Sequence, residues 1–573
     1  MATLKYNSED EINQVKNTIL ERRRELVQQS QILSRTLYKD KKREHQPNTN
    51  HTLLPFSHYT RFLYTSLSPH RYSPNPSKTQ TVQTVQQTFK SGYTRPLKFR
   101  RHQLEQLWRL IDENTDALCE VLYKDLRKHR NEATLGELVT TKEDINDALV
   151  HLEEWAKDER TTPSFINRVG TTCIKRKEPK GAVLVIAPWN YPVYLALTPL
   201  VGAIAAGCSA VLKPSEVAPH SARLIAELVP RYLDNKAFMV INGGAPETTQ
   251  LLDHKWDHIF YTGNGTVAKI IMKAAAKHLT SLTLELGGKS PVIIDENANM
   301  AVAAKRIAFG KAFNAGQTCI APDYVLVTAK AEEKLIPALK NAYLEMYGSD
   351  PQASKDYGRI VNTRHFKRLC NVLMENKSGD VVIGGQADEN DLFIAPTVIA
   401  NVERDDKLME EEIFGPLLPL IRVTDIDDAI EYINSKDEPL ALYIFSTNKK
   451  LINKVLDSTR SGGVLVNDTL MHVSENSLPF GGTGPSGMGA YHGRHSFDTF
   501  THVRSTMIKG LSPMMESAMA IRYAPYTPQG LSIARVIMET VPQFKKGFLQ
   551  RYIKWIVVGI LFGVHYARNR RLQ

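Results

Sequence analysis

The sequence predicts an α/β protein in which two α/β domains face one another across a cleft. At 573 residues the chain is too long for one compact hydrophobic core. Short apolar runs that end in Gly, Pro or Asp alternate with segments of helical periodicity. This alternation is typical of a parallel, doubly wound sheet that binds ligands at the carboxyl ends of its strands. A second series of the same kind follows Asp295, so we expect two such domains.

The first predicted elements are helical. Residues 1–80 are expected to form an N-terminal extension, in which a charged segment rich in helix formers (11–44) is followed by a polar, Pro-containing linker. From Thr81 to about Asp158 the apolar spacing is again helical. The clearest apolar stripe consists of Phe99, Leu104, Leu107, Leu110 and Ile111.

Buried strands are predicted where a short apolar run precedes Gly, Pro or Asp. In the first series these runs are residues 181–188, 209–214, 238–243, 258–263 and 290–295, and a further strand is expected to end at Glu285. Helices are expected between them at 221–232 and 265–277. In the second series the predicted strands are residues 324–329, 393–399, 418–423 and 463–468.

The net charge of +11 is concentrated at the two ends of the chain. Residues 1–80 carry 13 Lys and Arg against 7 Asp and Glu, and residues 511–573 carry 9 against 2. The enzyme-sized middle is therefore close to neutral, which argues against a nucleic-acid partner. A basic tail beside an apolar helix instead suits an anionic membrane surface.

The five cysteines support neither a disulfide framework nor a zinc site. They are an odd number, widely spaced, without a CxxC pair or a nearby His cluster, so no metal is expected. Residues 1–20 lack the apolar run of a secretory signal, and the acids Glu9, Asp10 and Glu11 argue against a mitochondrial presequence. These features favour a reducing, cytosol-facing location.

Cys319, in the segment AFNAGQTCIAP, is the candidate nucleophile. A lone cysteine in an apolar context is usually an inert core residue. Here Gly316, Gln317 and Thr318 are small or polar, and they bring the backbone close to the sulfur, where amide groups can stabilise negative charge.

Two further residues have both a structural and a chemical interpretation. Glu285, in LELGGKSP, is either a buried structural acid or a general base whose pKa is raised by desolvation. Asn190, in the Pro-bracketed turn APWNYP, serves either the turn itself or an oxyanion to which its amide donates.

These segments, taken together, resemble the aldehyde dehydrogenase superfamily over about residues 81–510. Seven motifs occur in that family's order and rough spacing: APWNYP, LKPSE, FYTGNG, LELGGKSP, FNAGQTC, EEIFGP and PFGGTGPSGMG. The late segments PLALYIFS (439–446) and SGMGAYHGRHSFDTFTH (486–502) resemble class 3, the branch that includes fatty aldehyde dehydrogenases. A C-terminal tail after RYAPY (522–526) is also similar to that branch.

The resemblance implies the fold and the domain organisation of that family. The implied parts are a doubly wound NAD-binding domain (81–285), an α/β catalytic domain (286–492), a small β oligomerisation flap (160–181 with 493–515) and a C-terminal tail (516–573) that contains a membrane helix at about 552–567. Similarity to class 3 also implies a homodimer.

The resemblance further implies catalytic roles. Cys319 would attack an aldehyde, the oxyanion would accept hydrogen bonds from the Asn190 amide and the Cys319 backbone N–H, and Glu285 would activate the water that hydrolyses the thioester. Loss of the thiol, amide or base would have favoured a non-catalytic scaffold, and all three are present. The remaining candidates for acid–base chemistry, interpreted instead as packing or surface groups, are His472, His492 and His495.

For the cofactor, the resemblance places Lys213 and Glu216 of LKPSE at the adenosine ribose. A carboxylate there hydrogen-bonds a free 2′-hydroxyl and repels a 2′-phosphate, which favours NAD, although class 3 enzymes can also use NADP. Glu412 would hold the nicotinamide ribose and Phe414 would pack beside the ring. The residues assigned to the cofactor side also include Gly263 and Trp189.

The C-terminal tail contains an uncharged run of 13 residues, Trp555 to Ala567, with basic residues on both sides. A helix of this length covers only about 20 Å, against roughly 30 Å of hydrocarbon. Flanking aromatic and basic residues can extend its reach, so we expect a membrane helix, with a core or partner-docking helix as the alternative. The short span favours the mitochondrial outer membrane over the endoplasmic reticulum or a lipid droplet.

The sequence thus predicts NAD(P)-dependent oxidation of medium- and long-chain apolar aldehydes by a membrane-anchored enzyme that faces the cytosol. Anchoring implies a substrate already in the bilayer. The alternative is a semialdehyde or aromatic aldehyde dehydrogenase in which the tail only localises the protein.

Overall fold

The computed structural model describes residues 77–164, 167, 170–513, 516 and 519–538. The described residues all belong to one of the chain's two units, residues 74–573. The expected helix in 11–44 and the expected membrane helix at 552–567 lie outside the described residues. Among the helices that the structure does describe, none is long and apolar enough to cross a membrane.

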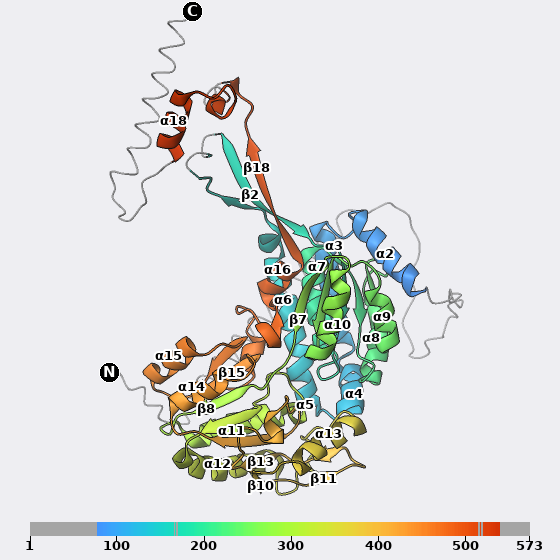
Figure 1. The fold of residues 1–573 in the computed structure, drawn as a ribbon. Coiled ribbons are helices and arrows are strands. Elements are labelled where there is room, and N and C mark those ends of the chain that lie inside the picture. Colours follow the sequence, from blue (N-terminus) through green and yellow to red (C-terminus); the bar gives the residue numbers. More distant parts are fainter. Residues whose placement is uncertain (1–76, 165–166, 168–169, 514–515, 517–518, 539–573) are drawn as a thin grey trace, which may run out of the picture. The chain divides into compact units, whose positions relative to one another are not determined.

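A group of helices precedes the first sheet (Figure 1). They are α2 (Lys78–Lys90), α3 (Leu97–Glu113), α4 (Thr115–Leu126), α5 (Arg130–Ala133), the π-helical turn η1 (Thr134–Val139) and α6 (Thr140–Ala156). The predicted stripe lies on α3, where its four leucine and isoleucine side chains are buried and Phe99 packs at the edge of the core. The first helix begins at Lys78, slightly before the predicted start at Thr81.

The first sheet has six strands in the order β17-β7-β6-β3-β4-β5. They are β3 (Ala182–Ile186), β4 (Ser209–Lys213), β5 (Phe238–Val240), β6 (His258–Thr262), β7 (Ser281–Glu285) and β17 (Gly487–Met488). β3 to β7 are parallel, and the chain adds strands to one side of β3 and then to the other, which makes the sheet doubly wound. The carboxyl ends of these five strands therefore share one edge.

Four helices connect the strands of this sheet: α7 (Tyr194–Ala206), α8 (Pro219–Tyr232), α9 (Ala245–Leu252) and α10 (Gly265–Ala276). Every residue of α7 is buried, as expected for a helix that is apolar on all sides. The helices predicted at 221–232 and 265–277 correspond to α8 and α10.

The second sheet has seven strands in the order β10-β13-β14-β9-β8-β15-β16, and all but β10 run parallel to their neighbours. The strands are β8 (Pro291–Ile294), β9 (Tyr324–Val327), β10 (Asp380–Ile383), β13 (Thr397–Ala400), β14 (Leu417–Arg422), β15 (Ala441–Phe445) and β16 (Gly463–Val466). Its helices are α11 (Met300–Ala312), α12 (Ala329–Tyr347), α13 (Thr363–Met374), α14 (Ile426–Asn434) and α15 (Lys449–Ser458). The prediction of two α/β sheets is confirmed.

The run 290–295, predicted as the last strand of the first series, is instead β8 of the second sheet. The second series also differs from the prediction in several details. Residues 393–399 are not one strand: β12 (Phe393–Ile394) pairs with β11 (Ala387–Asp388), and β13 belongs to the large sheet. Pro396 lies between them, and proline has no N–H to donate to a strand ladder. Strand β15 was not predicted from the apolar pattern, although all of its residues are buried.

A separate antiparallel sheet pairs two strands that precede the first large sheet in the sequence with one strand that follows β17. Its strands are β1 (Glu159–Thr161), β2 (Thr171–Pro179) and β18 (Thr501–Lys509), and α16 (Gly493–Thr499) leads into β18. β2 and β18 lie side by side over their full length, from the pair Pro179 and Thr501 to the pair Thr171 and Lys509 (Figure 1). Most side chains of β18 are exposed in the chain on its own.

Candidate active site

Cys319 follows a strained turn at the end of α11. Asn314, Ala315 and Gly316, in the short helix η3 (Phe313–Gly316), have φ angles of 53°, 51° and 74°. This left-handed region is costly for residues other than glycine. A Cβ atom on Gly316 would lie 2.3 Å from the carbonyl oxygen of Gly415, so that position also requires glycine for space. The turn carries Cys319 to a half-buried position.

The surroundings of Cys319 favour the neutral thiol. Burial and the carboxylates of Glu285 and Glu412 raise the pKa of the Cys319 thiol well above its ordinary value. The backbone amides of Cys319 and Ile320 lower that pKa, as expected for amide groups near the sulfur, but their effect is smaller. The thiol proton must therefore leave when the sulfur attacks.

The Asn190 amide reaches the loop that carries the sulfur. Asn190 lies between β3 and α7, and only 3% of its surface is exposed. Its Nδ2 donates a hydrogen bond of 3.0 Å to the carbonyl oxygen of Gln317. An amide nitrogen carries two hydrogens, so one remains for a second acceptor beside the sulfur loop. The structure thus brings together two segments that are far apart in the sequence.

Glu285 is the last residue of β7 and is 1% exposed. Among the groups that the structure describes, neither of its carboxylate oxygens has a hydrogen-bond partner. Its backbone is fixed, since the Gly263 N–H donates to its carbonyl oxygen at 3.0 Å. Burial and the nearby Glu412 carboxylate raise the pKa of Glu285 to about 8. A carboxylate with open lone pairs and this pKa suits proton transfer near neutral pH.

The loop that carries Glu412 is held by hydrogen bonds from Lys289. The Lys289 ammonium donates to Asp323 at 2.5 Å and to the carbonyl oxygens of Leu408 and Glu411 at 2.7 and 2.9 Å. Burial and the Asp323 carboxylate raise the pKa of Glu412 to about 8. Burial is the larger of these two causes, and the Lys289 ammonium acts in the opposite direction by lowering the pKa.

Glycine is required where this loop meets the end of β7. A Cβ atom on Gly287 would lie 2.4 Å from Oε2 of Glu412, so the close approach of the two segments needs glycine there.

Two aromatic residues from the predicted cofactor side lie against each other. The rings of Trp189 and Phe414 meet edge to face with centroids 5.3 Å apart, and the Trp189 ring is also 4.9 Å from that of His365. Trp189 directly precedes Asn190, and Phe414 is two residues from Glu412. The end of β3 is therefore joined to the Glu412 loop.

The carboxyl ends of β4, β5 and β6 fit a dinucleotide. The Lys213 ammonium, at the end of β4, donates to Glu216 at 2.9 Å and to the carbonyl oxygen of Gly243 at 2.8 Å. The Glu216 side chain is half exposed, so its carboxylate is available to a ribose. A Cβ atom at Gly263 would lie 2.1 Å from the Tyr261 hydroxyl, whereas one at Gly265, at the start of α10, would meet nothing within 4 Å. Open space at a helix N-terminus suits a pyrophosphate.

Comparison with known proteins decides the family. Residues 75–506 match the model of the aldehyde dehydrogenase family. The chain belongs to the aldehyde dehydrogenase family. Aldehyde dehydrogenase family 3 member B1 from Bos taurus is 49% identical over 460 residues, which cover 80% of this chain and 97% of that protein. Family 3 member A2 from Rattus norvegicus is 46% identical over 479 residues, which cover 84% and 97%.

A solved structure agrees with these relatives. The substrate-bound state of Staphylococcus aureus AldH has a TM-score of 0.74 and 42% identity, and the match covers 78% of this chain and 98% of that chain. This aldehyde dehydrogenase is accordingly an oxidoreductase that converts aldehydes to carboxylic acids, and its cofactor is NAD or NADP. The resemblance to class 3 is confirmed.

The surroundings of two histidines near the late glycine motif, His472 and His492, favour the neutral ring. Burial lowers the pKa of His472 to about 4 and that of His492 to about 3, so both rings are neutral at pH 7. His492 instead shares a hydrogen bond of 3.0 Å with the Tyr194 hydroxyl, and its ring stacks on Phe480 with centroids 5.0 Å apart.

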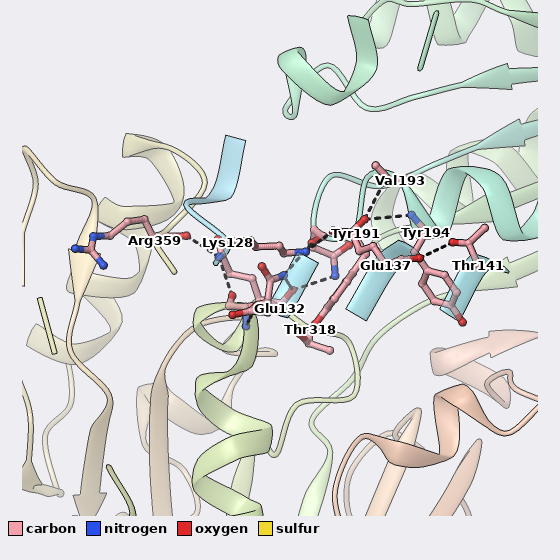
Figure 2. A network of polar contacts seen from close by, with 12 residues as sticks. Lys128, Glu132, Glu137, Thr141, Tyr191, Val193, Tyr194, Thr318 and Arg359 are labelled. Atoms are coloured by element: carbon pink, nitrogen blue, oxygen red, sulfur yellow. Dashed lines mark hydrogen bonds and ion pairs between the residues drawn. The ribbon is translucent and has the colours of Figure 1, made fainter. Parts of the chain in front are cut away.

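Several charged or polar residues of this aldehyde dehydrogenase site were not predicted from the sequence. Beside Asn190 the structure places a connected polar network whose unpredicted members include Lys128, Glu132, Glu137 and Asn314 (Figure 2). The first three of these lie in the segment DLRKHRNEATLGELVTTKED, which contains many charges, and no spacing within it distinguishes the buried ones. Only the fold shows which of these charges face inward.

Proposed function

We propose that this aldehyde dehydrogenase oxidises medium- and long-chain apolar aldehydes with NAD or NADP through a thioester on Cys319. The observation that carries the catalytic assignment is the convergence of three groups: the Cys319 thiol, the Asn190 amide bonded to the sulfur loop at 3.0 Å, and the buried Glu285 carboxyl. A cycle that forms and then hydrolyses a thioester needs one nucleophile, one oxyanion donor and one base.

In the first half of the cycle the Cys319 sulfur attacks the aldehyde carbon. The thiol proton passes to solvent water as the C–S bond forms, and the carbonyl oxygen becomes an oxyanion. The second Nδ2 hydrogen of Asn190 and the backbone N–H of Cys319 donate to that oxygen. A nicotinamide bound here would supply the hydride acceptor, so that the C=O bond could re-form and leave an acyl group on the Cys319 sulfur.

In the second half Glu285 acts on water. Its ionised carboxylate takes a proton from a water molecule, which attacks the thioester carbon and forms the carboxylic acid as the C–S bond breaks. The pKa of about 8 matches this task, because the group must hold a proton and release it again near neutral pH.

The cofactor assignments rest on the fit of the strand ends to a dinucleotide. Lys213 and Glu216 would hold the adenosine ribose, Gly263 would let the backbone approach the cofactor, and Glu412 would hold the nicotinamide ribose. Phe414 and Trp189 would pack beside the ring. The half-exposed Glu216 carboxylate supports a preference for NAD over NADP, since it repels a 2′-phosphate.

The substrate class, the anchor and the assembly are further parts of the proposal. Similarity to class 3 and the uncharged run 555–567 support apolar aldehydes delivered from a membrane. We assign the run to a helix that holds the catalytic part at the cytosolic face of the mitochondrial outer membrane, with the endoplasmic reticulum and lipid droplets as other sites. The β1-β2-β18 sheet, with its exposed strand β18, is proposed as the contact of a homodimer.

Turnover of a panel of aldehydes tests the chemistry and the substrate class. We expect kcat/KM, followed by NADH absorbance, to rise from butanal to hexadecanal and to exceed the values for succinic semialdehyde and benzaldehyde. Cys319→Ala should abolish NADH formation, whereas the matched control Cys370→Ala, a half-buried thiol on α13, should retain it. Activity that survives Cys319→Ala removes the proposed nucleophile, and a preference for the semialdehyde removes the apolar substrate class.

A deletion tests the anchor. In cells, the full chain should stay with membranes through carbonate extraction, and a chain that lacks residues 551–573 should be released. Retention of the shortened chain would refute the tail assignment.

A further inference from the structure

Lys128 and Glu137 form an ion pair that is completely buried beside the candidate active site. Nζ of Lys128 lies 2.6 Å from Oε1 of Glu137, and both side chains are 0% exposed. Removing two charges from water costs several kcal/mol per ion, so such a pair persists only where other hydrogen bonds satisfy both groups. The partners of these two side chains therefore indicate what the pair holds in place.

The second oxygen of Glu137 caps helix α7. Oε2 accepts hydrogen bonds from the backbone N–H groups of Val193 and Tyr194 at 2.9 and 3.1 Å. These are orphan donors at the positive end of the helix, and Val193 itself supplies no side-chain cap. Glu137 lies within the π-helical turn η1, where the Thr141 hydroxyl donates to its carbonyl oxygen at 2.6 Å. The wider turn places the carboxylate at the start of α7, three residues after Asn190.

Lys128 holds the other end of the same loop. Its ammonium donates to the carbonyl oxygen of Asn190 at 2.9 Å and lies 3.9 Å from the centre of the Tyr191 ring. The ion pair thus fixes the backbone at Asn190 and again at Val193 and Tyr194 (Figure 2). The Asn190 side chain extends from a backbone that the pair holds on both sides.

Glu132, from the same segment, holds the sulfur loop. Its Oε1 accepts the backbone N–H of Asn314 at 2.6 Å, in the left-handed turn that precedes Cys319. The Asn314 side chain closes the arrangement, because its Nδ2 donates to the carbonyl oxygens of both Asn190 and Gln317, at 2.9 and 3.0 Å.

We propose that Lys128, Glu132 and Glu137 form a positioning bracket that sets the Asn190 amide against the Cys319 loop. Lys128 and Glu137 fix the amide side, and Glu132 fixes the sulfur side. The inference rests on the proposed role of Asn190 as oxyanion donor. If the pair only stabilised the fold, its removal would lower the stability of the protein and leave the chemical step of the folded molecules unchanged.

A double-mutant cycle with Asn190 tests the bracket. The combined change Lys128→Met with Glu137→Gln removes both charges and leaves no lone buried ion. In the full chain we expect kcat to fall about 10- to 100-fold, less than the roughly 10²- to 10³-fold found for complete loss of an oxyanion donor, while the KM for NAD changes less than about twofold. In an Asn190→Ala background the same change should lower kcat less than about threefold, because the group that it positions is gone.

A matched control separates positioning from general stability. Glu332, which is 2% exposed, pairs with Arg422 between α12 and β14. Glu332→Gln should lower the melting temperature and leave kcat unchanged. Glu132→Gln is a milder second variant, to be used if the double change prevents folding. It should lower kcat several-fold when Asn190 is present and should have little effect in the Asn190→Ala background.

The possible failures are distinct. An equal loss of kcat in both backgrounds, or unchanged kcat in a folded Lys128→Met with Glu137→Gln variant, overturns the bracket. Unchanged kcat in Asn190→Ala alone overturns the proposed oxyanion donor instead.

Discussion

Glu137 and Glu285 are both withdrawn from solvent, with 0% and 1% of their surface exposed, but their surroundings are opposite. The Glu137 carboxylate accepts hydrogen bonds from the Lys128 ammonium and from two backbone N–H groups. The Glu285 carboxylate accepts none from the described part of the chain, and its pKa is raised to about 8. The difference indicates that burial alone does not make an acid catalytic. A carboxylate whose lone pairs are occupied holds position, and one whose lone pairs are open can move a proton.

The largest expected effect comes from removing the open carboxylate. Glu285→Gln should lower kcat by roughly 10²- to 10⁴-fold, the usual contribution of a general base, with little change in the KM for NAD. Steady-state NADH formation measures this. If Glu285→Gln keeps wild-type turnover, Glu285 is a structural acid like Glu137.

Removing the occupied carboxylate should instead affect folding. Glu137→Gln leaves the Lys128 ammonium buried without its counter-ion, which typically costs about 3–5 kcal/mol. Urea unfolding followed by circular dichroism should show this loss, and the added change Lys128→Met should recover part of it. A Glu137→Gln variant as stable as the wild type would contradict the pair's role.

The pH dependence of turnover distinguishes the two glutamates directly. Below a pKa of about 8 Glu285 is mostly protonated, so kcat should rise roughly tenfold per pH unit and level off above pH 8. Glu285→Gln should remove this rise, and Glu137→Gln should retain it. A rise that persists in Glu285→Gln assigns the ionisation to another group.

The stability of the fold should depend on the same ionisation, but it should fall over the pH range in which kcat rises. Because the folded state raises the pKa of Glu285 above its ordinary value of 4.5, the folded state binds the proton more tightly and loses stability as pH rises from about 5 to 8. Glu285→Gln lacks this ionisation, so the melting temperature of the variant minus that of the wild type should increase as pH rises over this range.

A third glutamate gives the smallest effect. Glu216 is half exposed and paired with Lys213. In its proposed place at the adenosine ribose, its charge should affect cofactor choice rather than proton transfer or folding. Glu216→Gln should raise kcat/KM for NADP by about tenfold, equivalent to about 1.4 kcal/mol, and change the value for NAD less. An unchanged ratio of the two cofactors would remove Glu216 from the ribose site.

The sequence predicted the parts of this site that depend on short local patterns. Apolar runs before Gly, Pro or Asp located most of the parallel strands but not β15, and the segments around Cys319, Asn190 and Glu285 led to the catalytic proposal. The division of 393–399 into two strands does not show in the apolar pattern, because Pro396 breaks the strand without interrupting the run of apolar residues.

The positioning groups could not be predicted in the same way. Lys128 and Glu137 stand among other charged residues, and whether they face the core depends on a π-helical turn and on the packing of α7. Similarly, the open lone pairs of Glu285 are a property of its surroundings after folding, since its neighbours in the sequence indicate burial but not hydrogen bonding.

The most direct test of the contrast between the two glutamates is a rapid-mixing measurement of NADH formation by Glu285→Gln. If Glu285 is the base for thioester hydrolysis, this variant should still form the thioester. It should therefore release a burst of NADH close to one equivalent per active site, followed by a steady rate at least about 100-fold below that of the wild type. Absence of the burst, with the first turnover as slow as later ones, would contradict the account by placing Glu285 before hydride transfer.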